Sequence, residues 1–166
     1  MPGTKVLPTA AMAPTTAHTK PTRAAHRASS AARATAAKMS LNDYQRLRSL
    51  LAARRGAAGG TAAIWHVENK LGNALMFNAE HLPPDVVSIN SRVRIENTTT
   101  GGKFTYTLVF PGEANIIDGK LSVLSPLGCA LLGQTVGDTV TYRAPGGEES
   151  VRILRLEFQP ESVGQY

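Results

Sequence analysis

Two consecutive prolines, Pro83 and Pro84, separate a stretch with helical periodicity from a stretch with strand periodicity. A proline cannot continue a helix, and it disfavours helical backbone at the residue before it, so the pair ends any preceding helix. Apolar residues recur every three or four positions before the pair and mostly every second position after it. The sequence therefore predicts an α+β protein in which a helical segment precedes a β-sheet.

The segment 40–80 is predicted to form a short antiparallel helical hairpin of the coiled-coil kind. Ser40 is placed to cap the first helix, and Gly56 is placed to end it in a left-handed conformation. A second helix is expected to begin near Ala62. The apolar stripes of the two helices are Leu41, Tyr44, Leu47 and Leu51 in the first and Ile64, Val67, Leu71 and Leu75 in the second.

The expected tip of this hairpin is basic and glycine-rich. Arg54, Arg55 and Gly56 lie there, and the stretch from Ala52 to Ala63 contains no Asp or Glu. Divalent cations such as Mg²⁺ are bound by oxygen ligands, above all by carboxylates. The tip is therefore not expected to hold a metal ion.

The segment 84–166 is predicted to be an antiparallel sheet of about four or five strands with one short helix. The strands are centred on Val93–Ile95, Phe104–Phe110, Leu121–Val123, Val140–Tyr142 and the run from 149 to 158. The short helix is expected from Pro126, which suits a first helical turn, to Gly133. In the last strand the alternation changes phase between Ile153 and Leu154, which predicts a β-bulge or burial on both faces.

The net charge of +6 belongs to the first 39 residues. They hold six of the eighteen Lys and Arg residues and no acid, whereas residues 40–166 are balanced. Residues 1–39 contain few large apolar side chains, so they are predicted to form a disordered basic leader. Three interpretations stay open for it: a solvated tail or an over-extended start before Met39, an arm that binds a polyphosphate such as nucleic acid, and a transit peptide.

Composition restricts the remaining classes of function. No apolar run reaches the roughly 18 residues that a membrane span needs. The single cysteine, Cys129, fits a reducing, cytoplasmic setting and excludes a cysteine-rich zinc site. It is expected to be a small packing residue, because the sequence suggests no base to activate it. We predict no catalytic residue, metal or cofactor.

Four segments after Pro84 resemble a known family. "INSRV", "YTLVFP", "GKLSVLSPLGCALLGQTVGD" and "LEFQPE" are similar to the Gre superfamily of bacterial transcription factors, in the branch of regulators of nucleoside diphosphate kinase. The resemblance covers roughly residues 40–166 and is strong over 84–161. It implies a helical arm followed by a domain with the FK506-binding-protein fold.

The resemblance also implies a partner, RNA polymerase, bound at the rim of its secondary channel. The residues expected to dock there are Ile117, Asp118, Ser125, Pro126, Leu127, Leu131 and Leu132. The alternative for the three leucines is that they belong to the core. Cys129 stands where Gre proteins usually have Arg, so the details of docking are expected to differ. Nucleoside diphosphate kinase is a second implied partner, reached by contact or through transcription, and the protein is expected to be a monomer.

The sequence departs from the family at the tip of the arm, and this difference distinguishes a transcript cleavage factor from a regulator that only binds polymerase. Cleavage factors of the family carry acids at the tip of the arm, where this chain has Arg54, Arg55 and Gly56. We therefore expect a polymerase-binding regulator that competes with Gre factors without cleaving transcripts. The alternatives are a Gre-like cleavage factor, a peptidyl-prolyl isomerase sharing the fold, and a nucleic-acid binder acting through the leader.

Overall fold

The computed structural model describes residues 36–58 and 62–165, and Ala34–Tyr166 form one compact unit. Residues 1–35 of the predicted leader lie outside the described residues. The last residues assigned to it do not: Lys38–Ser40 form a short strand, β1. Strand β1 therefore includes Lys38 and Met39, the last two residues assigned to the leader.

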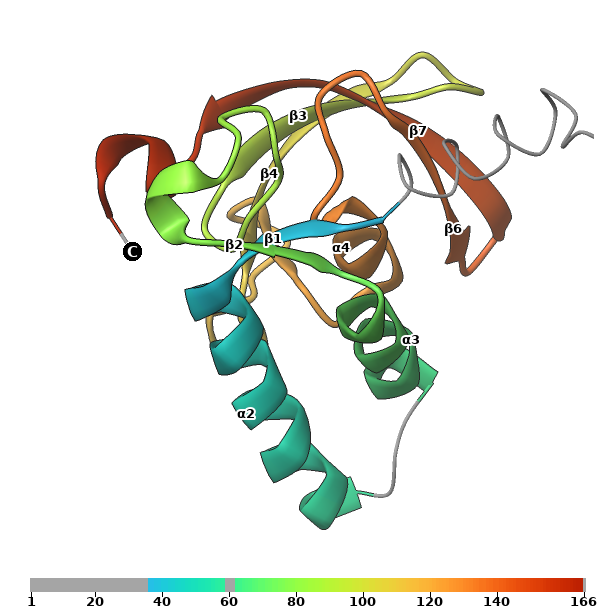
Figure 1. Cartoon of the computed structure of the whole chain (residues 1–166). Helices are drawn as coiled ribbons and strands as arrows, with labels where there is room; N and C mark the ends of the chain where they lie inside the picture. Colours follow the sequence, from blue (N-terminus) through green and yellow to red (C-terminus); the bar gives the residue numbers. More distant parts are fainter. Residues whose placement is uncertain (1–35, 59–61, 166) are drawn as a thin grey trace, which may run out of the picture. The chain divides into compact units, whose positions relative to one another are not determined.

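Helix α2 (Leu41–Ala58) and helix α3 (Ala62–Gly72) run in opposite directions, as predicted (Figure 1). The Oγ of Ser40 accepts a hydrogen bond from the backbone N–H of Asp43 at 3.2 Å, which confirms the predicted cap. The prediction that Gly56 ends the first helix is wrong, because α2 continues to Ala58. The two alanines after Gly56 are strong helix formers and favour this extension.

The prediction that Leu75 continues the stripe of the second helix is also wrong. Helix α3 ends at Gly72, and Leu75 begins strand β2 (Leu75–Phe77), where its side chain is 45% exposed. The backbone N–H of Leu75 donates to the carbonyl of Ala37 at 2.8 Å, and β2 pairs with β1 in parallel. A three-residue strand has too little periodicity to be distinguished from the end of a helix.

Five strands form the main sheet, in the order β5-β4-β3-β7-β6. Their bounds are Arg92–Asn97 for β3, Lys103–Val109 for β4, Lys120–Ser122 for β5, Thr139–Ala144 for β6 and Gly147–Phe158 for β7. All neighbours are antiparallel except β4 and β5, which are parallel. The expectation of a wholly antiparallel sheet is therefore wrong at this edge. The segment 110–119 between the two strands carries the chain back, so β5 starts beside the middle of β4.

The predicted bulge in the last strand is confirmed. Arg94 of β3 pairs with Arg155, and Ile95 pairs with Ile153, so Leu154 has no partner in the register. A bulge of this kind increases the twist of a strand and bends it. The bend helps the long strand β7 to curve over the core (Figure 1).

Helix α4 (Pro126–Leu131) lies under the curved sheet, between the sheet and α3 (Figure 1). Short 3₁₀ turns span Ala79–His81, Pro111–Glu113 and Glu161–Val163. One core joins the helices to the sheet; it includes Leu47, Leu51, Ile64, Val67, Val93, Ile95, Leu108, Leu131 and Ile153. None of the described helices is long and apolar enough to cross a membrane.

Gly128 is the residue that lets α4 approach the sheet. A Cβ atom at this position would lie 2.0 Å from the backbone oxygen of Ser122, far closer than any real contact. We expect Gly128→Ala to lower the free energy of unfolding by about 1–3 kcal/mol, as overpacking does. Alanine elsewhere in a helix would stabilise it.

The measurement is chemical denaturation of both the variant and a matched control. Gly112→Ala is the control, because a Cβ there meets nothing within 4 Å. It should change the free energy of unfolding by no more than about 0.5 kcal/mol. Equal stability of the two variants would contradict the close approach of α4.

Candidate functional site

The segment predicted to dock on a partner is held rigidly at its start. The Oγ of Ser125 accepts a hydrogen bond from the N–H of Gly128 at 3.0 Å and donates one to the carbonyl of Ser122 at 2.7 Å. Pro126 occupies the first turn of α4, and Gly133 follows the helix with a φ of 74°. A positive φ is favourable only for glycine, so the predicted helix end at Gly133 is confirmed.

The candidate docking residues of α4 divide into buried and exposed sets. Leu131 and Leu132 are fully buried, which favours the alternative that they belong to the core. Leu127 and Ser125 are half-buried, and Pro126 is exposed. A partner can therefore reach this segment mainly at the first turn of α4.

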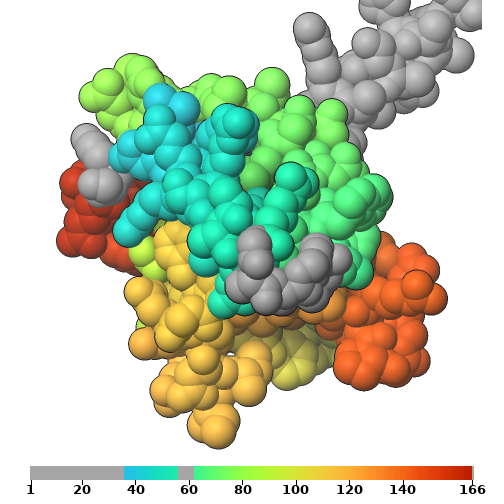
Figure 2. Space-filling view, turned by 90° about the horizontal axis from the view of Figure 1, so that it is seen from below, coloured from blue at the N-terminus to red at the C-terminus, as the bar shows by residue number. Residues whose placement is uncertain are grey.

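A loop before β5 presents the remaining candidates. The side-chain amide of Asn115 donates to the Oδ2 of Asp118 at 2.7 Å, and the N–H of Ile117 donates to the Oδ1 of Asn115 at 3.1 Å. These bonds fix the loop while its two isoleucines face solvent: Ile116 is 61% exposed and Ile117 is 91% exposed. Seen from below, residues of this part of the chain extend from the rim of the face that the helical hairpin occupies (Figure 2). A fixed loop with adjoining exposed apolar side chains is typical of a binding surface.

The basic residues predicted at the tip of the hairpin have different surroundings. Arg54 is exposed and forms no ion pair with any described residue. Arg55 pairs with Glu68 of α3, with 2.6 Å between Nη2 and Oε2. Gly56 lies inside α2. Sequence reasoning missed the partner of Arg55, because Glu68 is 13 positions away and the pairing depends on how the two helices meet.

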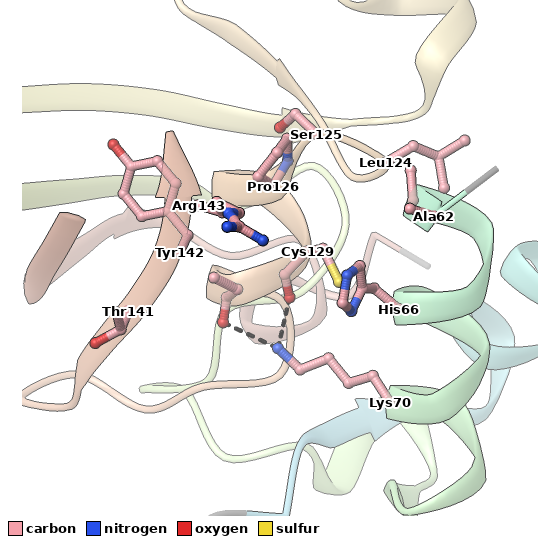
Figure 3. Close-up of a pocket in the computed structure, with 12 residues that line it drawn as sticks. Ala62, His66, Lys70, Leu124, Ser125, Pro126, Cys129, Thr141, Tyr142 and Arg143 are labelled. Atoms are coloured by element: carbon pink, nitrogen blue, oxygen red, sulfur yellow. Dashed lines mark hydrogen bonds between the residues drawn. The ribbon is translucent and has the colours of Figure 1, made fainter. Parts of the chain in front are cut away.

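A groove of about 550 Å³ lies beside α4, between α3 and β6 (Figure 3). Sequence reasoning missed the most unusual residue of this groove, Lys70 of α3. The Nζ of Lys70 donates to the carbonyls of Cys129 and Ala130, at 2.6 and 2.9 Å. Burial lowers the pKa of Lys70 to about 8 and raises the pKa of the Cys129 thiol. A raised pKa keeps the thiol protonated and unreactive, consistent with a packing role for Cys129.

Among the described residues, no group of three or more His, Cys, Asp or Glu side chains is arranged to hold a metal ion. The geometry thus offers a rigid surface at α4 and the Asn115–Asp118 loop, a basic tip and a cationic groove.

Comparison with known proteins connects this geometry to a family. The family described as "Transcription elongation factor, GreA/GreB, C-term" matches residues 82–158, which contain the five-stranded sheet and α4. The "Regulator of nucleoside diphosphate kinase" of Escherichia coli (strain K12) is 36% identical over 127 residues, which are 76% of this chain and 93% of that protein.

The chain belongs to the GreA/GreB family. The "Transcription elongation factor GreA" of Geobacillus kaustophilus (strain HTA426) is 40% identical over 91 residues, 55% of this chain and 58% of that protein. The solved structure "Prokaryotic transcription elongation factor GreA/GreB from Nitrosomonas europaea" matches 74% of this chain and 98% of its own, with a TM-score of 0.61 and 32% identity. The predicted resemblance and the mixed α+β architecture are confirmed, and all seven candidate docking residues fall in the range that the family matches.

Two acids of this GreA/GreB family member are buried where α2 meets the C-terminal segment. The Oδ2 of Asp43 accepts the backbone N–H of Ile89 at 2.9 Å, and Ser88 donates to the Oε2 of Glu161 at 2.6 Å. Burial raises the pKa of Asp43 to about 7, and the charge of Glu161 adds to the effect. Sequence reasoning missed the burial of Asp43, because an acid in the first turn of a helix is ordinarily exposed to solvent.

The raised pKa of Asp43 makes stability depend on pH. The folded protein binds a proton at Asp43 more tightly than the unfolded chain does, so the free energy of unfolding falls as the pH rises from about 4 to about 7. At about 1.4 kcal/mol per pH unit, this single group contributes at most about 4 kcal/mol. Asp43→Asn should reduce the slope, because the amide oxygen still accepts from Ile89 but carries no charge.

Urea denaturation at pH 5 and pH 8 measures the difference between the two proteins. The variant should gain stability relative to the wild type at pH 8. The free energy of unfolding of the two proteins could instead fall by the same amount between pH 5 and pH 8. That result would show that ionisation of Asp43 does not destabilise the folded state.

Proposed function

We propose that this protein binds RNA polymerase at the rim of the secondary channel and regulates transcription without promoting transcript cleavage. Membership of the GreA/GreB family supports the choice of partner. The docking surface consists of the first turn of α4 and the Asn115–Asp118 loop, which present Pro126 and Ile117 to solvent. The protein acts as a monomer and reaches nucleic acid only indirectly or weakly through its basic leader.

The composition of the hairpin tip carries the second half of the proposal. Two-metal chemistry requires carboxylates that hold the second ion, and no Asp or Glu occurs from Ala52 to Ala63. The next acid along α3, Glu68, pairs with Arg55. The arm therefore brings positive charge where cleavage would need negative charge.

Occupation of the channel rim is sufficient for a regulatory effect. A protein that shares the docking surface of Gre factors and lacks their acidic tip excludes them from the polymerase. The name of the Escherichia coli relative adds a link to nucleoside diphosphate kinase. Binding to that purified enzyme, measured in parallel with binding to polymerase, distinguishes direct contact from an action through transcription.

The first test is a binding titration of the full chain against core RNA polymerase, with a Gre cleavage factor as competitor. We expect binding that displaces the competitor, and we expect Ile117→Asp to raise the Kd by at least about tenfold, or 1.4 kcal/mol. Ile117 is almost fully exposed, so a charge there should leave the fold intact.

The matched control for this substitution is Met76→Asp. Met76 is also an exposed apolar residue, 54% accessible, but it lies on β2 outside the proposed surface. It should bind polymerase as the wild type does. Equal loss in both variants, or no binding of the wild type at micromolar concentration, would argue against the proposed surface.

Transcript cleavage is tested with a stalled, backtracked polymerase carrying end-labelled RNA. Addition of this protein should leave the RNA at its original length, because the tip supplies no ligand for a second metal ion. A Gre cleavage factor in the same assay serves as the positive control. RNA that shortens faster than with polymerase alone would overturn the argument from the tip.

A further inference from the structure

The groove beside α4 gathers two cationic side chains and a histidine. His66 and Lys70 come from α3 and Arg143 comes from β6, and in the close-up their nitrogen atoms surround Cys129 (Figure 3). Among the described residues that line the groove none is acidic, and none of these three side chains forms an ion pair with a described residue. The positive charges of Lys70 and Arg143, which come from two different elements, create a local attraction for anions.

Lys70 contributes the most strongly buried of these charges. An ammonium group has three donors, and the two carbonyls of α4 use two of them. Carbonyl oxygens are neutral partners, and a buried charge without an ion partner is costly. An anion in the groove would supply the missing negative charge.

Apart from Ser125 and Thr141, the rest of the groove is lined mainly by apolar side chains. Leu124, Pro126 and Ala130 line it together with Tyr142. Its volume of about 550 Å³ lies in the range of ordinary small-molecule pockets. This combination fits a ligand that carries both an anionic group and a flat or apolar part.

We propose that this groove binds a phosphorylated small molecule. The phosphate lies against Arg143, Lys70 and His66, because a guanidinium matches phosphate oxygens with two parallel hydrogen bonds. The apolar part rests on Leu124 and Pro126. The proposal goes beyond polymerase binding and is tested without polymerase.

One acid close to the groove provides a variant that should bind the ligand more tightly than the wild type does. Glu148 of β7 is the register partner of Arg143, and the two form no ion pair within 4 Å. Its negative charge opposes an incoming phosphate. Removal of that charge should therefore strengthen binding, an effect that damage to the fold would not produce.

The experiment is isothermal titration calorimetry of the full chain with inorganic pyrophosphate and with ADP. We expect saturable binding of ADP that Arg143→Gln weakens by at least tenfold and Glu148→Gln strengthens several-fold. Arg152→Gln is the matched control, because Arg152 is an exposed, unpaired arginine of β7 outside the groove. It should bind ADP as the wild type does. Tighter binding of ADP than of pyrophosphate would support the contribution of the apolar wall.

Two results would overturn the proposal. The first is no heat of binding for either probe at millimolar concentration. The second is an equal loss of binding in Arg143→Gln and Arg152→Gln. That result would show that the net positive charge of the protein, and not the groove, attracts the ligand. The basic leader is common to all variants, so it cannot produce a difference between them.

Discussion

The ammonium group of Lys70 joins the helical part of the molecule to the sheet. The last carbonyls of a helix have no partner within it, and in α4 two residues of the last turn, Cys129 and Ala130, use Lys70 as the donor. The charge also lies at the negative end of the short helix, where a cation is favourable. Helix α4 in turn packs on β6 and β5, so α3 is fixed to the sheet through a single side chain in addition to the shared core.

Backbone pairing reinforces this connection on the other side of α4. The N–H of Lys38 donates to the carbonyl of Gly133 at 2.8 Å, and Gly133 donates to Val87 at the same distance. Strand β1 therefore reaches the residue at which α4 ends. A Cβ at Gly133 would lie 2.7 Å from the Cβ of Ala37, so only glycine permits this approach. The result is a fixed position for the first turn of α4, which carries the proposed docking surface.

The sequence predicted those parts of the fold that depend on local patterns. Alternating side chains located the long strands, and the change of phase at Leu154 located a bulge that the pairing confirms. The features that depend on contacts between segments distant in the sequence were missed. They are the pairing of the three-residue strands β1 and β2 and the parallel pairing of β5 with β4. Of the candidate site, the short helix that begins at Pro126 and its end at Gly133 followed from sequence, whereas the cap at Ser125 did not. The burial of Asp43 and Lys70 did not, because a charged residue in a helix gives no local sign of what covers it.

The same reasoning explains how one fold can serve different functions in a family. The features that hold α4 and the Asn115–Asp118 loop in place are backbone bonds, a cap and close approaches, and these fix the position of the proposed docking surface. The chemistry delivered there depends on side chains at the hairpin tip, which contribute little to the core. The proposed function therefore needs a difference only at exposed residues of the arm such as Arg54 and Arg55, and such a difference leaves the fold and the proposed docking surface unchanged.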